Sequence, residues 1–327
     1  MAEESVRWSE PPGLPRANGG TVVTVGTFDG VHRGHWEVLR EVRRRADRTG
    51  RRSVLVTFDP HPLRIVRPAA APPLLTTPVE KKEILAESGL DYAVFLSFTP
   101  ALSRYSPRRF VEEVLISRLC LEHLVIGYDH GFGRGRSGDV DTLRSIGAEL
   151  GFEVDVVEAV GAEGAAVSSS AIRGALQVGD VQMAAGGLGR PYSLRGPVVR
   201  GDGRGRQLGF PTANVHVEGA DKLLPLEGVY AVRGVLRGGA VDGVLHLGPR
   251  PTFRGSPPSV ELHLFDFDAD IYGEEIRIDF VARIRPIHRF ATAAELVEAI
   301  RGDCEEARAL LAEDAARSDP GRGGTPA

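Results

Sequence analysis

The first half of the chain alternates short apolar runs with longer stretches that have helical spacing. Strands that alternate with helices of this length predict a parallel sheet with helices on both faces. Ligands of such sheets bind beyond the carboxyl ends of the strands. The turns after these runs are therefore the first candidates for a site. Between Thr21 and about Val160 the apolar runs are TVVTVGTF, SVLVTFDP, YAVFLSF, HLVIGYD and FEVDVVEAV.

After about residue 187 the pattern changes to an alternation of single apolar and polar residues. The run VELHLFDF places its valine and leucines on one face and Glu261 and His263 on the other, and IRIDFVARI alternates in the same way. A hairpin is predicted around Gly238-Gly239. Helical spacing returns only in TAAELVEAIRGDCEEARALLA. This half therefore predicts a small antiparallel β-barrel with a C-terminal helix.

The change of pattern divides the chain into two domains. A length of 327 residues exceeds what one hydrophobic core usually serves. We expect an α/β domain over residues 19–186 and a barrel domain over residues 187–312. Residues 1–18 and 313–327 are rich in Pro, Gly and polar residues, which predicts disordered tails.

Composition and charge narrow the class of protein. With 42% hydrophobic and 26% charged residues, the chain is typical of a soluble globular protein. Divided after Gly186, the two halves of the chain carry 22 basic against 24 acidic residues and 18 against 20, so neither half has the basic excess of a nucleic-acid-binding domain. Two cysteines cannot build a disulfide framework, and no apolar run approaches the length of a membrane span. Without a secretory signal, these features predict a cytoplasmic protein.

The first candidate site follows the first strand, in GTFDGVHRGH. Gly26, Gly30 and Gly34 allow the backbone to come close to a ligand, and His32 and His35 stand at the start of the next helix. A helix N-terminus with two imidazoles predicts an anion site. None of the three lysines follows a glycine, so the phosphate-binding GxxxxGK[ST] loop is excluded.

Alternatives stay open for this histidine pair. It could be part of a metal site with His61 as third ligand, or consist of two ordinary turn histidines. The motif VSSSAIR favours phosphate, because Ser169, Ser170 and Arg173 offer hydroxyls and a guanidinium at another helix start, although such serines are also common helix caps. Together the motifs favour nucleotidyl transfer, in which a phosphate nucleophile is already anionic and needs no general base.

The second candidate site combines GDGRGRQLGFPTAN with the acidic residue of the VELHLFDF run. Thr212 and Asn214 are two residues apart in an extended segment, so their oxygens point to the same side and could share one Mg²⁺ ion. Glu261 lies on the face of its strand opposite the aliphatic residues, and in a closed barrel that face could line a ligand cavity. The alternative interpretation is a basic hairpin loop and a solvated acid.

These motifs resemble those of the bacterial bifunctional riboflavin kinase/FAD synthetase family, over nearly all of residues 21–309. The family's adenylyltransferase module, a Rossmann-like HxGH nucleotidyltransferase with a parallel sheet, is similar to the chain in GTFDGVHRGH, TFDPHP, GYDHGFGRGRSG and VSSSAIR. Its riboflavin kinase module, an antiparallel β-barrel, is similar in PYSLRGPVVRGDGRGRQLGFPTANV, GVYAV, PTF and VELHLFDFDADIYG. The resemblance implies that riboflavin and ATP give FMN in the barrel, and that FMN and ATP give FAD and pyrophosphate in the α/β domain.

The resemblance also implies a role for individual residues. His32 and His35 would be catalytic contacts to ATP phosphates, Glu261 the base for the flavin 5′-hydroxyl, and Thr212 and Asn214 the Mg²⁺ ligands. The implied ATP- and phosphate-binding residues are Gly26, Phe28, Asp29, Gly34, Asp129, Ser169, Ser170 and Arg173 in the first module, and Gly203, Arg204, Gly205, Arg206 and Gly209 in a flap of the second.

The chain departs from the family pattern at a few positions. His130-Gly131 replaces Phe-Arg, Ser170 replaces Thr, His246 replaces Asn, and IRPIHRF lacks an acidic residue. A protein that keeps only the kinase is therefore one alternative, and a non-catalytic flavin carrier is another. Flavin binding alone requires neither a Mg²⁺ site nor a base, which disfavours the carrier. The expected partners are riboflavin, FMN and ATP, without nucleic acid or membrane, and a homo-oligomer is compatible with the sequence.

Overall fold

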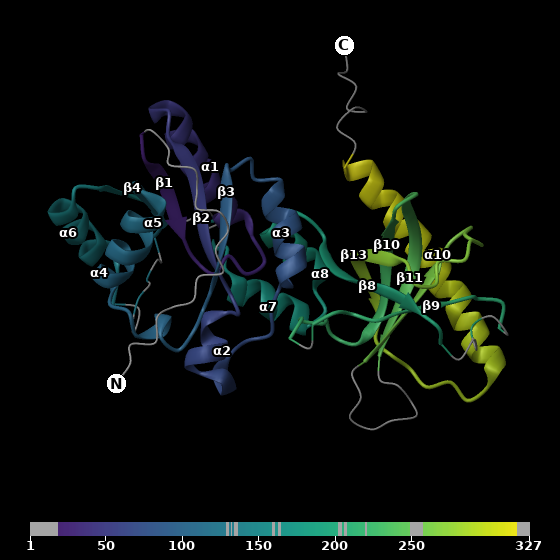
Figure 1. Ribbon diagram of the computed structural model, residues 1–327. Coiled ribbons are helices and arrows are strands. Elements are labelled where there is room, and N and C mark those ends of the chain that lie inside the picture. The colour runs from purple at the N-terminus through teal and green to yellow at the C-terminus, as the bar shows by residue number, and fades with distance from the viewer. Residues whose placement is uncertain are drawn as a thin grey trace, which may run out of the picture. The chain divides into compact units, whose positions relative to one another are not determined.

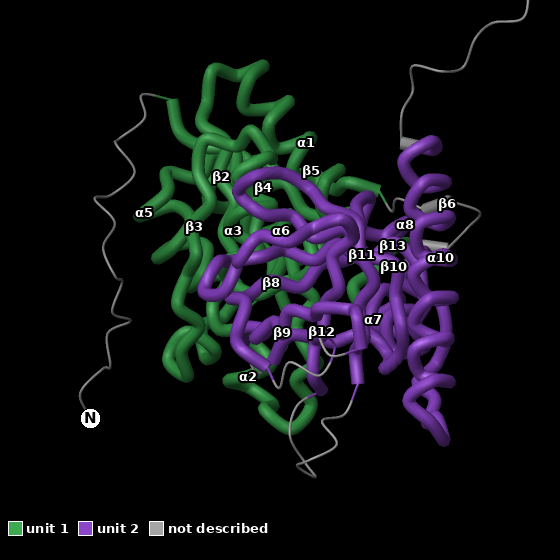
Figure 2. The backbone as a smooth tube through the Cα atoms, turned by 90° about the vertical axis from the view of Figure 1, so that its right-hand side faces the viewer, with its two compact units in different colours: residues 1–169 green, residues 170–327 purple. Residues whose placement is uncertain are grey.

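The computed structural model describes residues 19–128, 131, 133, 137–158, 161–162, 165–201, 205, 208–219, 221–248 and 258–318. The chain forms two compact units, Met1–Ser169 and Ser170–Ala327, which Figure 2 colours separately. The expected boundary lies later, after residue 186. The difference arises because α8 (Val181–Leu188) packs against barrel strands and Leu176 of α7 (Ser169–Gln177) accepts a backbone hydrogen bond from Leu226.

The first unit contains a five-stranded sheet in which every pair of neighbours is parallel, with the order β3-β2-β1-β4-β5 (Figure 1). This confirms the parallel sheet predicted from the alternating pattern. The order reverses direction on either side of β1, so the turn after β1 lies at a topological switch point, where ligands of open α/β sheets bind. The strands are β1 (Thr21–Val25), β2 (Arg52–Asp59), β3 (Tyr92–Ser97), β4 (Leu121–Gly127) and β5 (Glu153–Val157).

Helices cover both faces of this sheet, as the apolar strand sequences predict. In β1, Val22 packs into the core formed with α1 and α3, whereas Val23 packs into the core formed with the helices of the other face. On the first face lie α1 (Arg33–Thr49) and α3 (Pro78–Ala86). On the second lie α4 (Pro107–Phe110), η3 (Val111–Ile116) and α6 (Val140–Leu150). The short elements are α2 (Pro62–Val66), η1 (Pro68–Ala70), η2 (Leu102–Arg104), α5 (Ser117–Leu119), β6 (Gly161–Ala162) and β7 (Ala165–Ala166).

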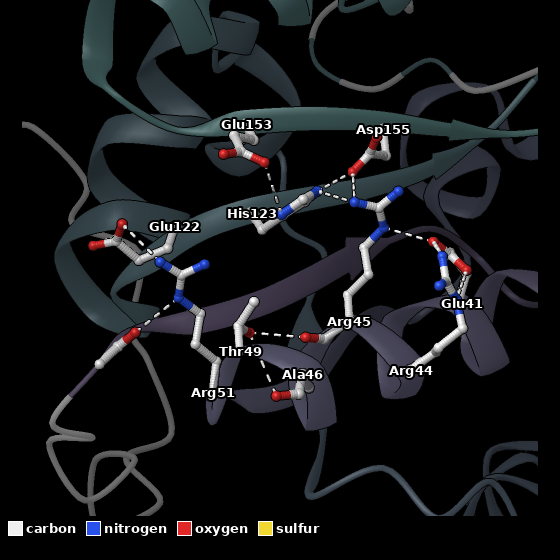
Figure 3. Close-up of polar contacts among 11 residues, drawn as sticks. Glu41, Arg44, Arg45, Ala46, Thr49, Arg51, Glu122, His123, Glu153 and Asp155 are labelled. Atoms are coloured by element: carbon white, nitrogen blue, oxygen red, sulfur yellow. Dashed lines mark hydrogen bonds and ion pairs between the residues drawn. The ribbon is translucent and has the colours of Figure 1, made fainter.

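A polar cluster fixes the C-terminal half of α1 to the sheet (Figure 3). His123 of β4 is buried, with its Nδ1 3.4 Å from a carboxylate oxygen of Glu153 and its Nε2 in contact with the carboxylate of Asp155. Arg45 of α1 forms an ion pair with Asp155 at 2.5 Å and another with Glu41. These contacts hold the helix that begins at the first candidate site.

The second unit is a closed barrel of antiparallel strand pairs, which confirms the predicted architecture. The expected hairpin forms, with Leu236 and Gly239 paired at its end. β9 has only three residues but joins β12 to β8 and so closes the ring. The ring order is β10-β11-β12-β9-β8-β13, with β8 (Tyr192–Val199), β9 (Ala213–Val215), β10 (Gly228–Leu236), β11 (Gly239–Gly248), β12 (Ser259–Leu264) and β13 (Glu275–Arg285).

The C-terminal helix α10 (Ala293–Ser318) covers part of the outside of the barrel. Its Ala307 and Leu311 pack against Val244 of β11, so the alternate residues Leu245 and Leu247 face the barrel interior. The helix continues six residues past 312, and the prediction of a disordered tail from residue 313 is wrong for residues 313–318, because their sequence is rich in helix-forming Ala, Glu and Arg. Residues 1–18 and 319–327 lie outside the described residues.

Candidate functional site

The two histidines of the first candidate site cap the helix that they begin. His32 is the N-cap of α1, and its Nδ1 accepts a hydrogen bond from the backbone N–H of His35 at 3.4 Å. The Nδ1 of His35 accepts in return from the N–H of His32 at 3.3 Å. Histidine thus supplies both halves of a capping box, a motif usually built from Ser or Thr with Glu.

This arrangement fixes the tautomer of both rings. A nitrogen that accepts an N–H hydrogen bond carries no proton, so the proton of each neutral imidazole is on Nε2, which is a donor. The rings stack with centroids 3.6 Å apart and an interplanar angle of 17°. Two N–H donors at the N-terminus of a 17-residue helix form an environment suited to an anion.

The three glycines of this loop make room for the chain itself. A Cβ at Gly26 would lie 2.8 Å from the ring of Phe28, and one at Gly34 would lie 3.3 Å from the ring of His32. Gly30 has a φ of 81°, which favours glycine. At Gly26 and Gly34 the space beside the backbone is occupied by the side chains of Phe28 and His32, and the approach of a ligand to these glycines stays a prediction.

Asp29 and Ser169 both hold the loop in place. Asp29 is 1% exposed, and its carboxylate accepts hydrogen bonds from the backbone N–H groups of Leu75 and Thr76 at 3.0 and 3.1 Å. The hydroxyl of Ser169 donates to the backbone carbonyl of Asp29 at 2.9 Å. These bonds give both residues a structural role, and their contact with a nucleotide stays a prediction.

For the other residues predicted for the first site, the structure gives the exposure of the side chain or no description. Ser170 is exposed and Arg173 is half-buried on α7, and their contact with a phosphate stays a prediction. Gly131 is described, whereas Asp129 and His130 lie outside the described residues.

The proposed third ligand of a metal site, His61, has a different role. It is the N-cap of α2, and its Nδ1 accepts from the N–H of Leu63 at 3.2 Å. Within the part of the chain that the structure describes, no three His, Cys, Asp or Glu residues form a group that could hold a metal ion.

The second candidate site is built on one row across the barrel wall. Glu261 of β12 pairs with Asn214 of β9 on one side and with His246 of β11 on the other. Cross-strand partners have side chains on the same face, and His246 shares the outer face with Val244. Burial lowers the pKa of His246, while the nearby Glu261 carboxylate opposes this shift. The structure thus brings together the predicted base and one predicted Mg²⁺ ligand.

Two described glycines after β8 lie close to the two predicted Mg²⁺ ligands. A Cβ at Gly201 would collide with the amide of Asn214, and one at Gly205 would lie 3.0 Å from Oγ1 of Thr212. The carbonyl of Gly205 accepts from the N–H of Phe210 at 2.8 Å, which turns the chain back toward β9. The neutral oxygen donors of Thr212 and Asn214 lie in a cradle of backbone and fit a hard cation that keeps most of its ligands as water and phosphate.

A cleft opens beside Thr212. Its cavity volume is about 260 Å³, and its lining includes Arg200, Asp268 and Tyr272, none of which was selected from the sequence. The guanidinium of Arg200 lies 4.8 Å from the centre of the Tyr272 ring. Asp268 and Tyr272 belong to the segment DADIYG after the strand of Glu261, and this segment was the sequence feature from which the cleft could have been predicted. The cleft and the row with Glu261 meet at β9, because Thr212 and Ala213 line the cleft and Asn214 belongs to the row.

His263 is a further functional candidate that the sequence alone placed only on the polar face. Its Nδ1 lies 2.8 Å from the carbonyl oxygen of Pro211, next to Thr212. Of the predicted flap, Gly205 and Gly209 are described, the latter with a φ of 84°. Gly203, Arg204 and Arg206 lie outside the described residues.

Two protein families match the chain, one over each candidate site. The family described as FAD synthetase matches residues 14–171, and the family described as riboflavin kinase matches residues 188–311. No helix among the described residues is both long and apolar enough to cross a membrane.

Relatives match over nearly the whole length. The chain is 38% identical to a bifunctional riboflavin kinase/FMN adenylyltransferase of Pseudomonas fluorescens, covering 91% of this chain and 95% of the relative. It is 36% identical to a protein of the same description from Bacillus subtilis, covering 88% and 91%. A crystal structure of a Streptococcus pneumoniae protein described as a macrolide-efflux protein shares 30% identity with a TM-score of 0.80, over 89% of this chain and 95% of that one. That description concerns the other protein, and the comparison adds the shared fold.

Proposed function

The chain belongs to the bifunctional riboflavin kinase/FMN adenylyltransferase family, and from this premise we propose which residues perform its two reactions. The enzyme phosphorylates riboflavin to FMN with ATP and adenylylates FMN to FAD with release of pyrophosphate. We assign the adenylyltransferase to residues 19–186 and the kinase to residues 187–312.

In the kinase reaction, Glu261 accepts the proton of the flavin 5′-hydroxyl as its oxygen attacks the γ-phosphorus of ATP. The bond to the β-phosphate oxygen breaks, and ADP leaves. A neutral hydroxyl is a weak nucleophile, so a positioned carboxylate accelerates this step. Thr212 and Asn214 would hold Mg²⁺, which when bound neutralises charge on the phosphates. The cross-strand pairing of Glu261 with Asn214 is the observation that supports this assignment, because the side chains of paired residues lie next to each other on one face.

In the adenylyl transfer, a phosphate oxygen of FMN attacks the α-phosphorus of ATP and pyrophosphate leaves. The nucleophile arrives without a proton, so the site must orient the reactants and stabilise charge. The Nε2–H groups of His32 and His35, with the N-terminus of α1, would donate to the phosphate oxygens. The reciprocal hydrogen bonds between the two histidines support this role, because they hold both rings as donors.

The assignment is tested by separating the two activities with single substitutions. Glu261→Gln keeps the size of the side chain but removes the base, so FMN formation should fall by roughly 10² to 10⁴-fold. FAD formation from supplied FMN should be unchanged. His32→Ala should do the reverse and lower FAD formation by about 10²-fold or more. Product formation is followed by chromatography.

Each outcome decides between the alternatives. If Glu261→Gln forms FMN at the wild-type rate while chemistry limits turnover, Glu261 is not the base. If the wild-type enzyme makes FMN but no FAD from FMN and excess ATP, the protein keeps only the kinase. Equal loss of both activities in His32→Ala would indicate unfolding rather than a catalytic role.

Mg²⁺ dependence and a cytoplasmic location are part of the proposal. Removal of Mg²⁺ with a chelator should abolish FMN formation, because Thr212 and Asn214 provide neutral oxygens but no charge to offset the phosphates. The free thiols of Cys120 and Cys304 support a reducing compartment.

A further inference from the structure

The loop that carries His32 has an unfavourable backbone conformation. Phe28 and Val31 have φ values of 46° and 39°, in the left-handed region that non-glycine residues rarely adopt, and β-branched residues least of all. Such a conformation persists only when surrounding contacts determine it. The groups that bond to this loop therefore decide where the histidines lie.

One of these groups is the ammonium of Lys81. Its Nζ donates a hydrogen bond to the carbonyl oxygen of Thr27 at 2.8 Å, and the hydroxyl of Thr57 donates to the same oxygen at 3.0 Å. Thr27 directly precedes Phe28, the first of the two residues with a positive φ, and lies four residues before Val31, the second. A charged donor makes a hydrogen bond about twice as strong as a neutral one, so Lys81 makes the stronger of the two bonds to this carbonyl.

Lys81 is placed so that it acts on the loop rather than on a substrate. It is 8% exposed on α3, whose N-terminus is fixed by a capping box between Thr77 and Glu80. The adjoining cavity, which Lys81 lines with Asp59 and His61, has a volume of about 20 Å³. That space admits a water-sized molecule and is too small for a nucleotide or a flavin.

Stability alone does not account for a lysine at this position. Burial of an ammonium carries a desolvation penalty, which lowers the pKa of Lys81 although Asp29 and Asp59 oppose the shift. An unbranched apolar side chain of similar length would avoid this penalty. The groups that favour a charged donor here are the carbonyl of Thr27, which accepts its hydrogen bond, and the carboxylates of Asp29 and Asp59.

We propose that Lys81 is a positioning residue for adenylyl transfer, which holds the Thr27 carbonyl and thereby the loop that presents His32 and His35. The proposal rests on the assignment of these histidines to that reaction. The reaction is sensitive to small displacements, since a shift of about 1 Å in a catalytic group can lower a rate by about 10²-fold.

The test compares Lys81→Met with Lys82→Met, a matched control on the next, exposed residue of α3. Lys81→Met should lower kcat for FAD formation by roughly 10- to 100-fold, with KM for ATP and FMN changed less than kcat. FMN formation by the same protein should stay at the wild-type rate, and its melting temperature should not fall. Lys81→Arg, which keeps a charged donor, should recover most of kcat. Lys82→Met should match the wild type.

Wild-type kcat in folded Lys81→Met would overturn the proposal, and so would equal loss of both activities. A Lys81→Arg variant as impaired as Lys81→Met would also overturn it.

If Lys81→Met does not fold, Thr57→Val provides the test, because it removes the second donor to Thr27 at nearly constant volume and should lower kcat for FAD in the same way. His32→Ala distinguishes a failure of the positioning role of Lys81 from a failure of the histidine assignment. If it lowers FAD formation and Lys81→Met does not, only the positioning role is wrong, whereas wild-type FAD formation in His32→Ala refutes the underlying assignment.

Discussion

At the scale of single residues, the first site depends on which nitrogen of each imidazole the backbone uses. Because Nδ1 of His32 and His35 accepts a backbone N–H, each ring keeps a proton on Nε2. An Asn or Gln in the same place could also donate to phosphate, but would not reproduce the stacked rings with centroids 3.6 Å apart. The hydrogen bonds to Nδ1 thus turn two titratable side chains into fixed donors.

The lowered pKa of Lys81 predicts opposite pH effects on activity and stability. As pH rises through this pKa, the ammonium loses its charge and FAD formation should fall. Between the lowered pKa of the folded protein and the ordinary lysine value of 10.5, Lys81 is protonated in the unfolded chain but not in the folded one. The free energy of unfolding should therefore increase with pH over this interval. Lys81→Arg stays charged and should retain FAD formation to higher pH than the wild type.

Rate and melting temperature, measured for both proteins between pH 8 and about pH 10.5, check this prediction. Identical alkaline limbs of the FAD rate in wild type and Lys81→Arg would contradict it. FMN formation in the same samples is the control, because Lys81 lies in the other unit.

At the scale of elements, the sites are made where a loop returns over a strand. The segment after β8 passes over β9 so closely that Gly201 has no room for a Cβ beside the Asn214 amide. The strand itself contributes the register that pairs Asn214 with Glu261. Loop and strand are therefore both needed to place the predicted Mg²⁺ ligands.

Gly201→Ala should displace the side chain of Asn214 and disable the kinase. We expect FMN formation to fall by about 10²-fold, the cost of a displacement near 1 Å, with weakened Mg²⁺ dependence. FAD formation from FMN should be unaffected. Gly238→Ala is the matched control, because a Cβ there meets nothing within 4 Å. Wild-type FMN formation in Gly201→Ala would show that the loop does not constrain Asn214 during catalysis.

Sequence reasoning succeeded where local pattern decides the structure. The alternation in VELHLFDF predicted that Glu261 lies on the face opposite the aliphatic residues, and the alternating runs and helices predicted the parallel sheet. It failed where the decisive partners are distant along the chain, as for Lys81 and Thr27, or Arg200 and Tyr272. The capping box of His32 and His35 was missed for another reason, because imidazole rarely supplies both of its halves.

At the scale of the whole molecule, the two sites belong to separate compact units. Each unit has its own buried apolar cluster, so each should keep its site when the other is altered. FMN is the product of one reaction and the substrate of the other.

A mixture of Glu261→Gln and His32→Ala proteins should therefore convert riboflavin to FAD, although neither variant does so efficiently alone. The first supplies an intact adenylyltransferase and the second an intact kinase, and FMN diffuses between them. FAD is measured by chromatography over time, with wild-type enzyme at the same total concentration as reference. No FAD in the mixture, despite FMN release by His32→Ala, would mean that the adenylyltransferase accepts FMN only within one molecule.

The short strand β9 gives the barrel an unusual closure. Its three residues provide the hydrogen bonds that join β12 to β8, and the central one is Asn214. Local opening of a protein begins where few bonds must break, so we expect the barrel to open first at β9, the strand that holds a predicted ligand residue. A nucleotide bound at Thr212 and Asn214, as proposed, would therefore also stabilise the closed barrel, since its binding free energy would oppose the opening of β9. Nucleotide binding and the closing of the barrel would in this way be thermodynamically coupled.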